Sequence, residues 1–104
     1  MFNVIARKTL VGYMEKYPLA KVSLGKWHNE IIEADFTNFN ELKSVYKNAS
    51  LIADHRVVFN IKGNDYRLVM RILFEYKSIQ VKWFGTHKEY DEIDVSTIKH
   101  KKND

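Results

Sequence analysis

The sequence predicts a small two-layer α+β domain, with an N-terminal strand and helices packed on one face of an antiparallel sheet. Three observations predict this fold. Apolar residues recur at three- and four-residue spacing in the first half of the chain, which is typical of amphipathic helices. From Arg56 onward they alternate with polar residues, which is typical of strands buried on one face. The apolar content of 45% and the charged content of 29% are those of a globular chain.

The first half of the chain is expected to begin with a strand and to continue with helices. An apolar segment at 2–6 with two β-branched residues predicts the strand. A helix is expected from Thr9 to Lys16, because Pro18 cannot continue it. A second helix is expected over 19–34. Its core-facing stripe consists of Ala20, Leu24, Trp27 and Ile31.

A third helix is expected to open at a capping-box-like pair, Asn38 followed by Glu41. Its apolar residues are Phe39, Leu42, Val45 and Tyr46. The chain is long enough for one core, so we expect a single domain over 1–98. The basic residues at 99–104 predict a disordered tail.

Three strands are expected in the second half, separated by turns at 62–65 and 75–78. Gly63 and Asn64 predict the first turn because both residue types accept positive φ. The core face is expected to carry Val57, Phe59, Ile61, Tyr66, Leu68, Met70, Ile72, Phe74, Ile79, Val81 and Trp83. The opposite face is expected to carry Arg56, Val58, Asn60, Lys62, Arg67, Val69, Arg71, Gln80, Lys82 and Phe84.

Nearly all the surplus positive charge of the chain falls in these strands. Residues 55–88 carry a net charge of +5, against +1 for residues 1–54 and −2 for residues 89–104. Like charges in cross-strand pairs repel, and no acidic residue stands opposite these cations in the expected pairing to relieve the repulsion. A sheet face of one sign therefore predicts an anionic ligand. A solvated face is the alternative, since antiparallel sheets often alternate in this way.

Several kinds of site are excluded by residues that the chain lacks. With no cysteine there is no disulfide framework and no thiolate zinc site, which fits a reducing cytoplasm. The four histidines do not have metal-ligand spacing, and no glycine-rich nucleotide motif occurs. No apolar run is long enough to span a membrane. We therefore expect no metal, no small-molecule cofactor and no membrane partner.

His87 and Tyr90 follow the last expected strand and are the candidates for proton transfer. A histidine or tyrosine in that place is more often structural, but here both lie at the end of a cationic face. Metal-free RNA cleavage would use these groups: a base deprotonates the 2′-hydroxyl, cations stabilise the phosphorane, and an acid protonates the 5′-oxygen. Two other hypotheses remain open: an RNA- or ribosome-binding protein without catalysis, and a basic module that docks an acidic protein.

Two segments carry a family resemblance. RVVFNIKGNDYRLV at 56–69 and FGTHKEYD at 84–91 closely resemble the HigB family of type II toxin–antitoxin toxins, within the RelE-like superfamily. The segments VIARKTL, EKYP and KWHNEI in the first half are similar as well, so the resemblance covers essentially residues 1–98. One departure is His55, where the family pattern has asparagine.

The resemblance implies a metal-independent endoribonuclease that cuts translated mRNA, typically in the ribosomal A site, and a helix-turn-helix antitoxin, HigA, as its partner. It implies catalytic roles for Lys62, Arg67, His87 and Tyr90, without saying which is the base. It also implies RNA binding by a second set of residues on the sheet: Arg56, Asn60, Arg71 and Lys82.

Overall fold

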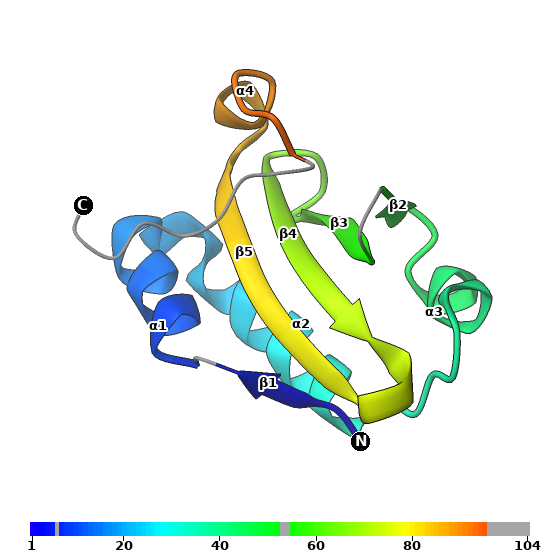
Figure 1. The fold of residues 1–104 in the computed structure, drawn as a ribbon. Coiled ribbons are helices and arrows are strands. Elements are labelled where there is room, and N and C mark those ends of the chain that lie inside the picture. The colour runs from blue at the N-terminus through cyan, green and yellow to red at the C-terminus, as the bar shows by residue number, and fades with distance from the viewer. Residues whose placement is uncertain (6, 53–54, 96–104) are drawn as a thin grey trace.

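The computed structural model describes residues 1–5, 7–52 and 55–95, which form a five-stranded sheet and four α-helices (Figure 1). The expected tail at 99–104 lies outside the described residues. The strands are β1 (Asn3–Ile5), β2 (Ser50–Leu51), β3 (Arg56–Ile61), β4 (Tyr66–Leu73) and β5 (Ser78–Thr86). The helices are α1 (Arg7–Lys16), α2 (Lys21–Glu33), α3 (Phe39–Val45) and α4 (His87–Tyr90). Short 3₁₀ turns occupy Pro18–Ala20 and Phe74–Tyr76.

The strands β3, β4 and β5 form the predicted antiparallel meander, and the β3–β4 pair confirms the alternation predicted from the sequence. Phe59 pairs with Leu68, and Val57 pairs with Met70, and all four side chains lie in one buried core. This apolar face of the sheet packs against α1 and α2; in Figure 1, α2 runs behind the sheet and α1 lies to the left of β5. The α+β class is therefore confirmed, with helices on one face of the sheet.

β1 joins the sheet at its edge and runs parallel to β5, with Asn3 opposite Ser78 and Ile5 opposite Gln80. The sheet order is β1-β5-β4-β3-β2, so the sheet is mixed rather than wholly antiparallel. The sequence predicts the strand, but it contains no local signal for this pairing, because the partner lies more than 70 residues away.

The helices cover the core with the predicted stripe. Ala20, Leu24 and Ile31 are fully buried and Trp27 is 3% exposed. α1 begins two residues before the expected start at Thr9 and ends, as expected, before Pro18. α2 itself begins at Lys21, because the preceding residues form the 3₁₀ turn.

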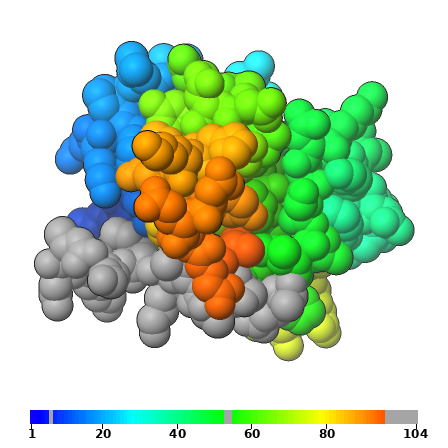
Figure 2. All heavy atoms as spheres, turned by 90° about the horizontal axis from the view of Figure 1, so that it is seen from above, coloured from blue at the N-terminus to red at the C-terminus, as the bar shows by residue number. Residues whose placement is uncertain are grey.

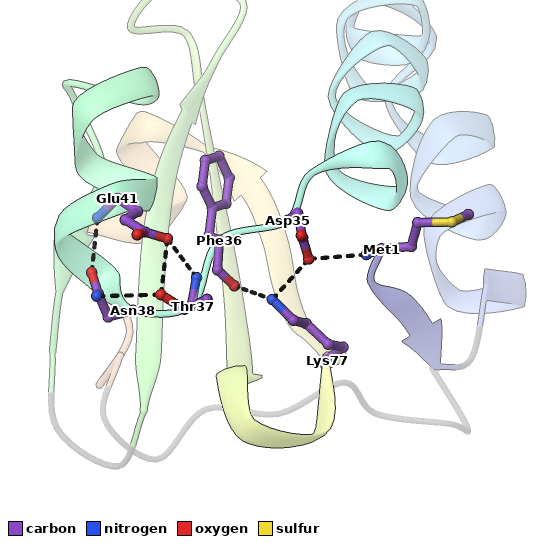
Figure 3. Close-up of polar contacts among 7 residues, drawn as sticks. All are labelled: Met1, Asp35, Phe36, Thr37, Asn38, Glu41 and Lys77. Atoms are coloured by element: carbon purple, nitrogen blue, oxygen red, sulfur yellow. Dashed lines mark hydrogen bonds and ion pairs between the residues drawn. The ribbon is translucent and has the colours of Figure 1, made fainter.

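α3 begins as predicted, with the Asn38 side chain accepting a hydrogen bond from the Glu41 backbone N–H at 3.0 Å (Figure 3). In a capping box the Glu41 carboxylate would accept from the backbone N–H of Asn38. Here it accepts instead from the backbone N–H and the hydroxyl of Thr37. Leu42 is buried as expected, but Val45 is 63% exposed and does not contribute to the core.

Lys77 holds together the end of the molecule shown in Figure 3, where the β4–β5 turn meets the segment before α3. Its backbone has φ 51°, and its ammonium group donates to the Phe36 carbonyl and lies 3.2 Å from Asp35 Oδ1. The same Asp35 oxygen lies 3.5 Å from the N-terminal amine. The hydrogen bond and charge of Lys77 lower the pKa of Asp35.

A register shift between Val69 and Met70 overturns one part of the predicted strand pattern. Met70 pairs with Val81 and Val69 pairs with Trp83, so Lys82 is an extra residue in β5. Such a β-bulge reverses the side-chain alternation beyond it. The predictions for two residues were therefore wrong: Phe84 is buried in the core, and Trp83 lies on the opposite face.

Candidate functional site

The sheet face away from α1 and α2, which we call the basic face, carries the cations that were predicted from strand alternation. Arg71 stands directly opposite Arg56 in the β3–β4 pair, and Arg67 stands opposite Asn60. Two apolar residues, Val58 and Val69, are also buried on this face. The two arginines of this cross-strand pair add to the positive potential of the basic face.

One end of the basic face brings together residues from two separate parts of the chain. The backbone N–H of His87 donates to the Asp65 carbonyl at 3.0 Å, so the start of α4 is held against the β3–β4 turn. In the β4–β5 pair, Tyr66 stands opposite Thr86 and Arg67 opposite Gly85. Figure 2 looks onto this end, where α4 (orange) lies beside the strands β3 and β4 (green).

Lys62 stands in the β3–β4 turn with φ 56°, and Gly63 follows with φ 65°. Asn64 does not have positive φ, although the sequence predicted that it would; Lys62 takes the left-handed conformation instead. The Lys62 ammonium lies 3.5 Å from Asp65 Oδ2, and both side chains are exposed. Such an exposed ion pair contributes little to stability, so the ammonium can exchange Asp65 for a phosphate at low cost.

Asn64 organises the neighbouring polar side chains, a role that the sequence did not indicate. Its side-chain oxygen accepts from Asn60 Nδ2 at 3.0 Å, and its backbone carbonyl accepts from the Arg67 guanidinium at 3.0 Å. The Arg67 guanidinium also donates to the Tyr66 carbonyl at 3.2 Å. Arg67 is thus oriented along the turn while it remains partly exposed on the basic face.

His87 is oriented by a carboxylate that sequence reasoning missed. The Nδ1 atom of His87 lies 3.2 Å from Oδ2 of Asp91, one helical turn later in the chain. Both side chains are exposed, and a carboxylate on Nδ1 leaves Nε2 as the nitrogen that can meet a substrate. The four-residue spacing of His and Asp within THKEYD was the available signal.

Tyr90 lies on the same short helix and is partly buried. Burial raises the pKa of its phenol, and the positive charge of Arg67 nearby opposes that shift. Its ring centroid lies 6.3 Å from that of Trp83, at an interplanar angle of 49°. Tyr90 thus lies close to both Arg67 and the indole that the β-bulge moves to the basic face.

α4 is held in place by a capping box and by a contact with the first half of the chain. Thr86 accepts from the Glu89 backbone N–H at 3.1 Å, and the Glu89 carboxylate accepts from the Thr86 backbone N–H at 2.8 Å. The same Glu89 oxygen accepts from the Tyr17 hydroxyl at 2.8 Å. These bonds, chiefly that from the Thr86 N–H, lower the pKa of Glu89. Tyr17 and Glu89 are supporting residues that the sequence did not single out.

The other predicted cations lie away from Lys62, Arg67 and α4. Arg71 lies four residues from Arg67 along β4, about 13 Å away at the usual rise of a strand. Lys82 is the extra residue of the bulge and is partly exposed. Arg56 is only 6% exposed, and its guanidinium donates to the Val95 carbonyl at 3.1 Å. The expectation that Arg56 would be exposed on the sheet is therefore not met.

His55 and the described acidic and histidine side chains add no further site. His55, the departure from the family pattern, is exposed with φ 60°, and its carbonyl accepts from the Ile72 backbone N–H. In the part of the chain that the structure describes, no group of three or more histidine or acidic side chains could hold a metal ion. Within the same residues, no helix is both long and apolar enough to cross a membrane.

The end cluster, which we define as Lys62, Arg67, His87, Asp91 and Tyr90, combines two cations with two groups capable of proton transfer. Arginine and lysine side chains can bind a phosphate and stabilise charge that builds on it. A histidine and a tyrosine can accept and donate the protons that a phosphodiester cleavage moves. The chain has no cysteine, so it has no thiolate nucleophile. The arrangement suits acid–base chemistry on a phosphodiester.

Comparisons with known proteins agree with this chemistry. The family model HigB_toxin, described as a RelE-like toxic component of a toxin–antitoxin system, matches residues 20–93, the range that contains the end cluster. A protein of Escherichia coli strain K12 named "mRNA interferase toxin HigB" is 34% identical over 91 residues, which cover 86% of this chain and 88% of that protein. An "mRNA interferase HigB" of Shigella flexneri has the same identity and coverage. Another, from Escherichia coli O6:H1, is 26% identical over 93 residues, 88% of this chain and 90% of that protein.

Proposed function

Since the chain belongs to the HigB family, the RelE-like toxic components of toxin–antitoxin systems, we infer that it is an mRNA interferase, an endoribonuclease that acts on messenger RNA. The observation that carries the assignment of the site is the meeting of the β3–β4 turn with α4 through the bond between Asp65 and His87. That bond gathers the end cluster at one end of a cationic sheet face.

We propose that cleavage proceeds by attack of the 2′-hydroxyl on the adjacent phosphate. His87 accepts the hydroxyl proton through Nε2, with Asp91 fixing the ring from the other side. Tyr90 takes the acid role and gives its phenolic proton to the 5′-oxygen as the bond between that oxygen and phosphorus breaks. The nearby positive charge of Arg67 favours the phenolate that remains. Arg67 and Lys62 stabilise the charge that develops on the phosphorane oxygens. No metal or small-molecule cofactor has a role in this scheme.

The remaining predicted residues are proposed to bind RNA outside the cleaved bond. Arg71 and Lys82 extend the cationic surface along the sheet, and Asn60 lies beside Arg67 in the adjacent strand. Arg56 contributes its positive charge to this face and no direct contact with RNA, because its guanidinium is buried. A phosphate backbone laid along this face would meet cations at successive positions.

The family implies an antitoxin partner and an RNA substrate. We propose further that the antitoxin is a HigA-type helix-turn-helix protein, that the substrate is mRNA in the ribosomal A site, and that the toxin acts in the cytoplasm. Ribosome dependence fits a small site with few base-reading groups, because the ribosome would then deliver and orient the message.

The experiment that tests this function is induced expression followed by mapping of mRNA 5′ ends. Wild-type toxin should produce new ends inside translated reading frames, and the same messages with their start codons removed should remain intact. A His87→Ala variant should produce neither the ends nor growth arrest. Growth arrest with intact messages would contradict a nuclease and favour a protein that only binds RNA or the ribosome.

A further inference from the structure

The β-bulge places an aromatic side chain among the cations of the basic face. Val81 and Phe84 both belong to the core, so Lys82 and Trp83 lie between them on the other face. Trp83 stands opposite Val69, which is fully buried, and the indole remains partly exposed. The indole therefore packs against the sheet while part of its surface stays open to solvent among the cations.

Gly85 shows where the indole lies. A Cβ added at Gly85 would stand 2.6 Å from Cη2 and 2.7 Å from Cζ2 of Trp83, closer than real Cβ atoms approach other atoms. The benzene ring of the indole therefore occupies the space that a side chain at residue 85 would fill. Gly85 is buried although its position faces the open side of the sheet, away from α1 and α2. The glycine is required for close approach of the ring to the backbone.

The indole also lies next to groups of the end cluster. Arg67 stands opposite Gly85 in the β4–β5 pair, so the ring that covers Gly85 lies about one interstrand spacing from the backbone of Arg67. Tyr90 flanks the indole with a centroid separation of 6.3 Å. An aromatic surface of two rings thus adjoins the arginine that we assign to the cleaved phosphate.

We propose that Trp83, flanked by Tyr90, forms a nucleobase-binding subsite that stacks a base of the nucleotide next to the cleaved bond. The inference rests on the proposed function for the identity of the ligand. Unpaired bases stack on aromatic side chains because every base presents a π-face, and such stacking tolerates different sequences. The subsite positions the nucleotide, while the cations hold its phosphate.

Fluorescence can test the stacking directly, because the chain has two tryptophans in distinct environments. Trp27 is 3% exposed in the core, so a bound base can reach only Trp83. The probe is a short single-stranded oligonucleotide with 2′-O-methyl riboses, which cannot be cut by 2′-hydroxyl attack. Titration should quench the wild-type signal, and a Trp83→Phe variant, which retains only Trp27, should show no quenching.

Binding affinities then separate stacking from a structural role. Trp83→Ala should weaken binding about 5- to 150-fold, and Trp83→Phe less, since a smaller ring still stacks. Neither change should alter the salt dependence of binding, because no phosphate contact is lost. The matched control is Tyr76→Ala, which removes an exposed aromatic ring, 72% exposed, from the turn at the opposite end of β5 and should bind like wild type.

An abasic oligonucleotide of the same length completes the test on the wild-type protein. It should bind as weakly to wild type as to Trp83→Ala, because the base and the indole act together. Quenching absent in wild type, or equal affinity of wild type and Trp83→Ala for the base-containing probe, would overturn the subsite. Quenching without any mRNA cleavage would support the subsite while rejecting the nuclease, so the two proposals fail separately.

Discussion

Replacement of Tyr17 by phenylalanine should reduce both the stability of the protein and its cleavage of mRNA. The Tyr17 hydroxyl donates to Glu89 Oε1 at 2.8 Å, which joins the first half of the chain to α4. Phenylalanine keeps the ring, whose centroid lies 5.4 Å from that of Phe84 and 5.8 Å from that of Tyr66. The change therefore removes one hydrogen bond and little packing.

The magnitude follows from the geometry of that bond. Hydrogen bonds to a charged group contribute about 1.5–3 kcal/mol when one partner is removed. Here the pair is only partly buried, and Glu89 keeps the Thr86 N–H as a donor, so we expect a loss of about 1–1.5 kcal/mol. For a domain of this size the Tm should fall by about 4–10 °C. Weaker docking of α4 by that energy should slow cleavage about five- to tenfold.

Tyr46→Phe is the matched control, because Tyr46 donates to the Glu30 carboxylate at 3.1 Å on the helical side of the molecule. It should lower the Tm by a similar or smaller amount and leave cleavage unchanged. The assay compares cleavage of one translated mRNA by the two variants and wild type, with Tm measured on the same preparations. Equal cleavage rates for Tyr17→Phe and Tyr46→Phe would refute the claim that the Tyr17–Glu89 bond positions α4.

Three further substitutions test the supports of the site. In the folded state the pKa of Glu89 is lowered, so the stability that its carboxylate contributes is present above about pH 4.3 and is lost as the pH falls through the folded pKa. The difference in Tm between wild type and Glu89→Gln should therefore shrink in acid. A constant difference from pH 3 to 6 would contradict this. Gly85→Ala should lower the free energy of unfolding in urea by about 1–3 kcal/mol and weaken RNA binding, because the new Cβ would stand 2.6 Å from the Trp83 ring and 2.9 Å from Glu89 Oε1. Unchanged binding would count against the placement of the indole. Asp91→Asn should slow cleavage by about tenfold or more, yet less than His87→Ala does, since Asp91 orients the imidazole; equal rates for wild type and Asp91→Asn would exclude that role.

The fold was predictable where a local pattern decides it. The stripe at Ala20, Leu24, Trp27 and Ile31 and the alternation through β3 and β4 both predicted side chains that the structure buries. The alternation failed in β5, because adjacent Trp83 and Phe84 are both apolar and fit either parity. Only the pairing with β4 reveals the extra residue at Lys82. A bulge depends on the partner strand, so the sequence of one strand does not determine it.

The residues of the site were likewise predictable where a local pattern indicates them, and not where their partners lie far away in the sequence. Strand alternation and the THKEYD segment indicated Arg67, His87 and Tyr90, which the structure brings to one end of the sheet. The environment of Arg56 was not predictable, since its guanidinium binds the carbonyl of Val95, 39 residues later. Tyr17 was missed for the same reason, because 72 residues separate it from Glu89.

The central claim is that the end cluster of the basic face cleaves mRNA, and Arg67 tests it most directly. The measurement compares cleavage of a translated mRNA by wild type, Arg67→Ala and Arg7→Ala, an arginine variant on the exposed surface of α1. We predict that Arg67→Ala slows cleavage about a hundredfold or more, as loss of a charge-stabilising donor does, while Arg7→Ala cleaves like wild type. Wild-type cleavage by a folded Arg67→Ala protein would contradict the account.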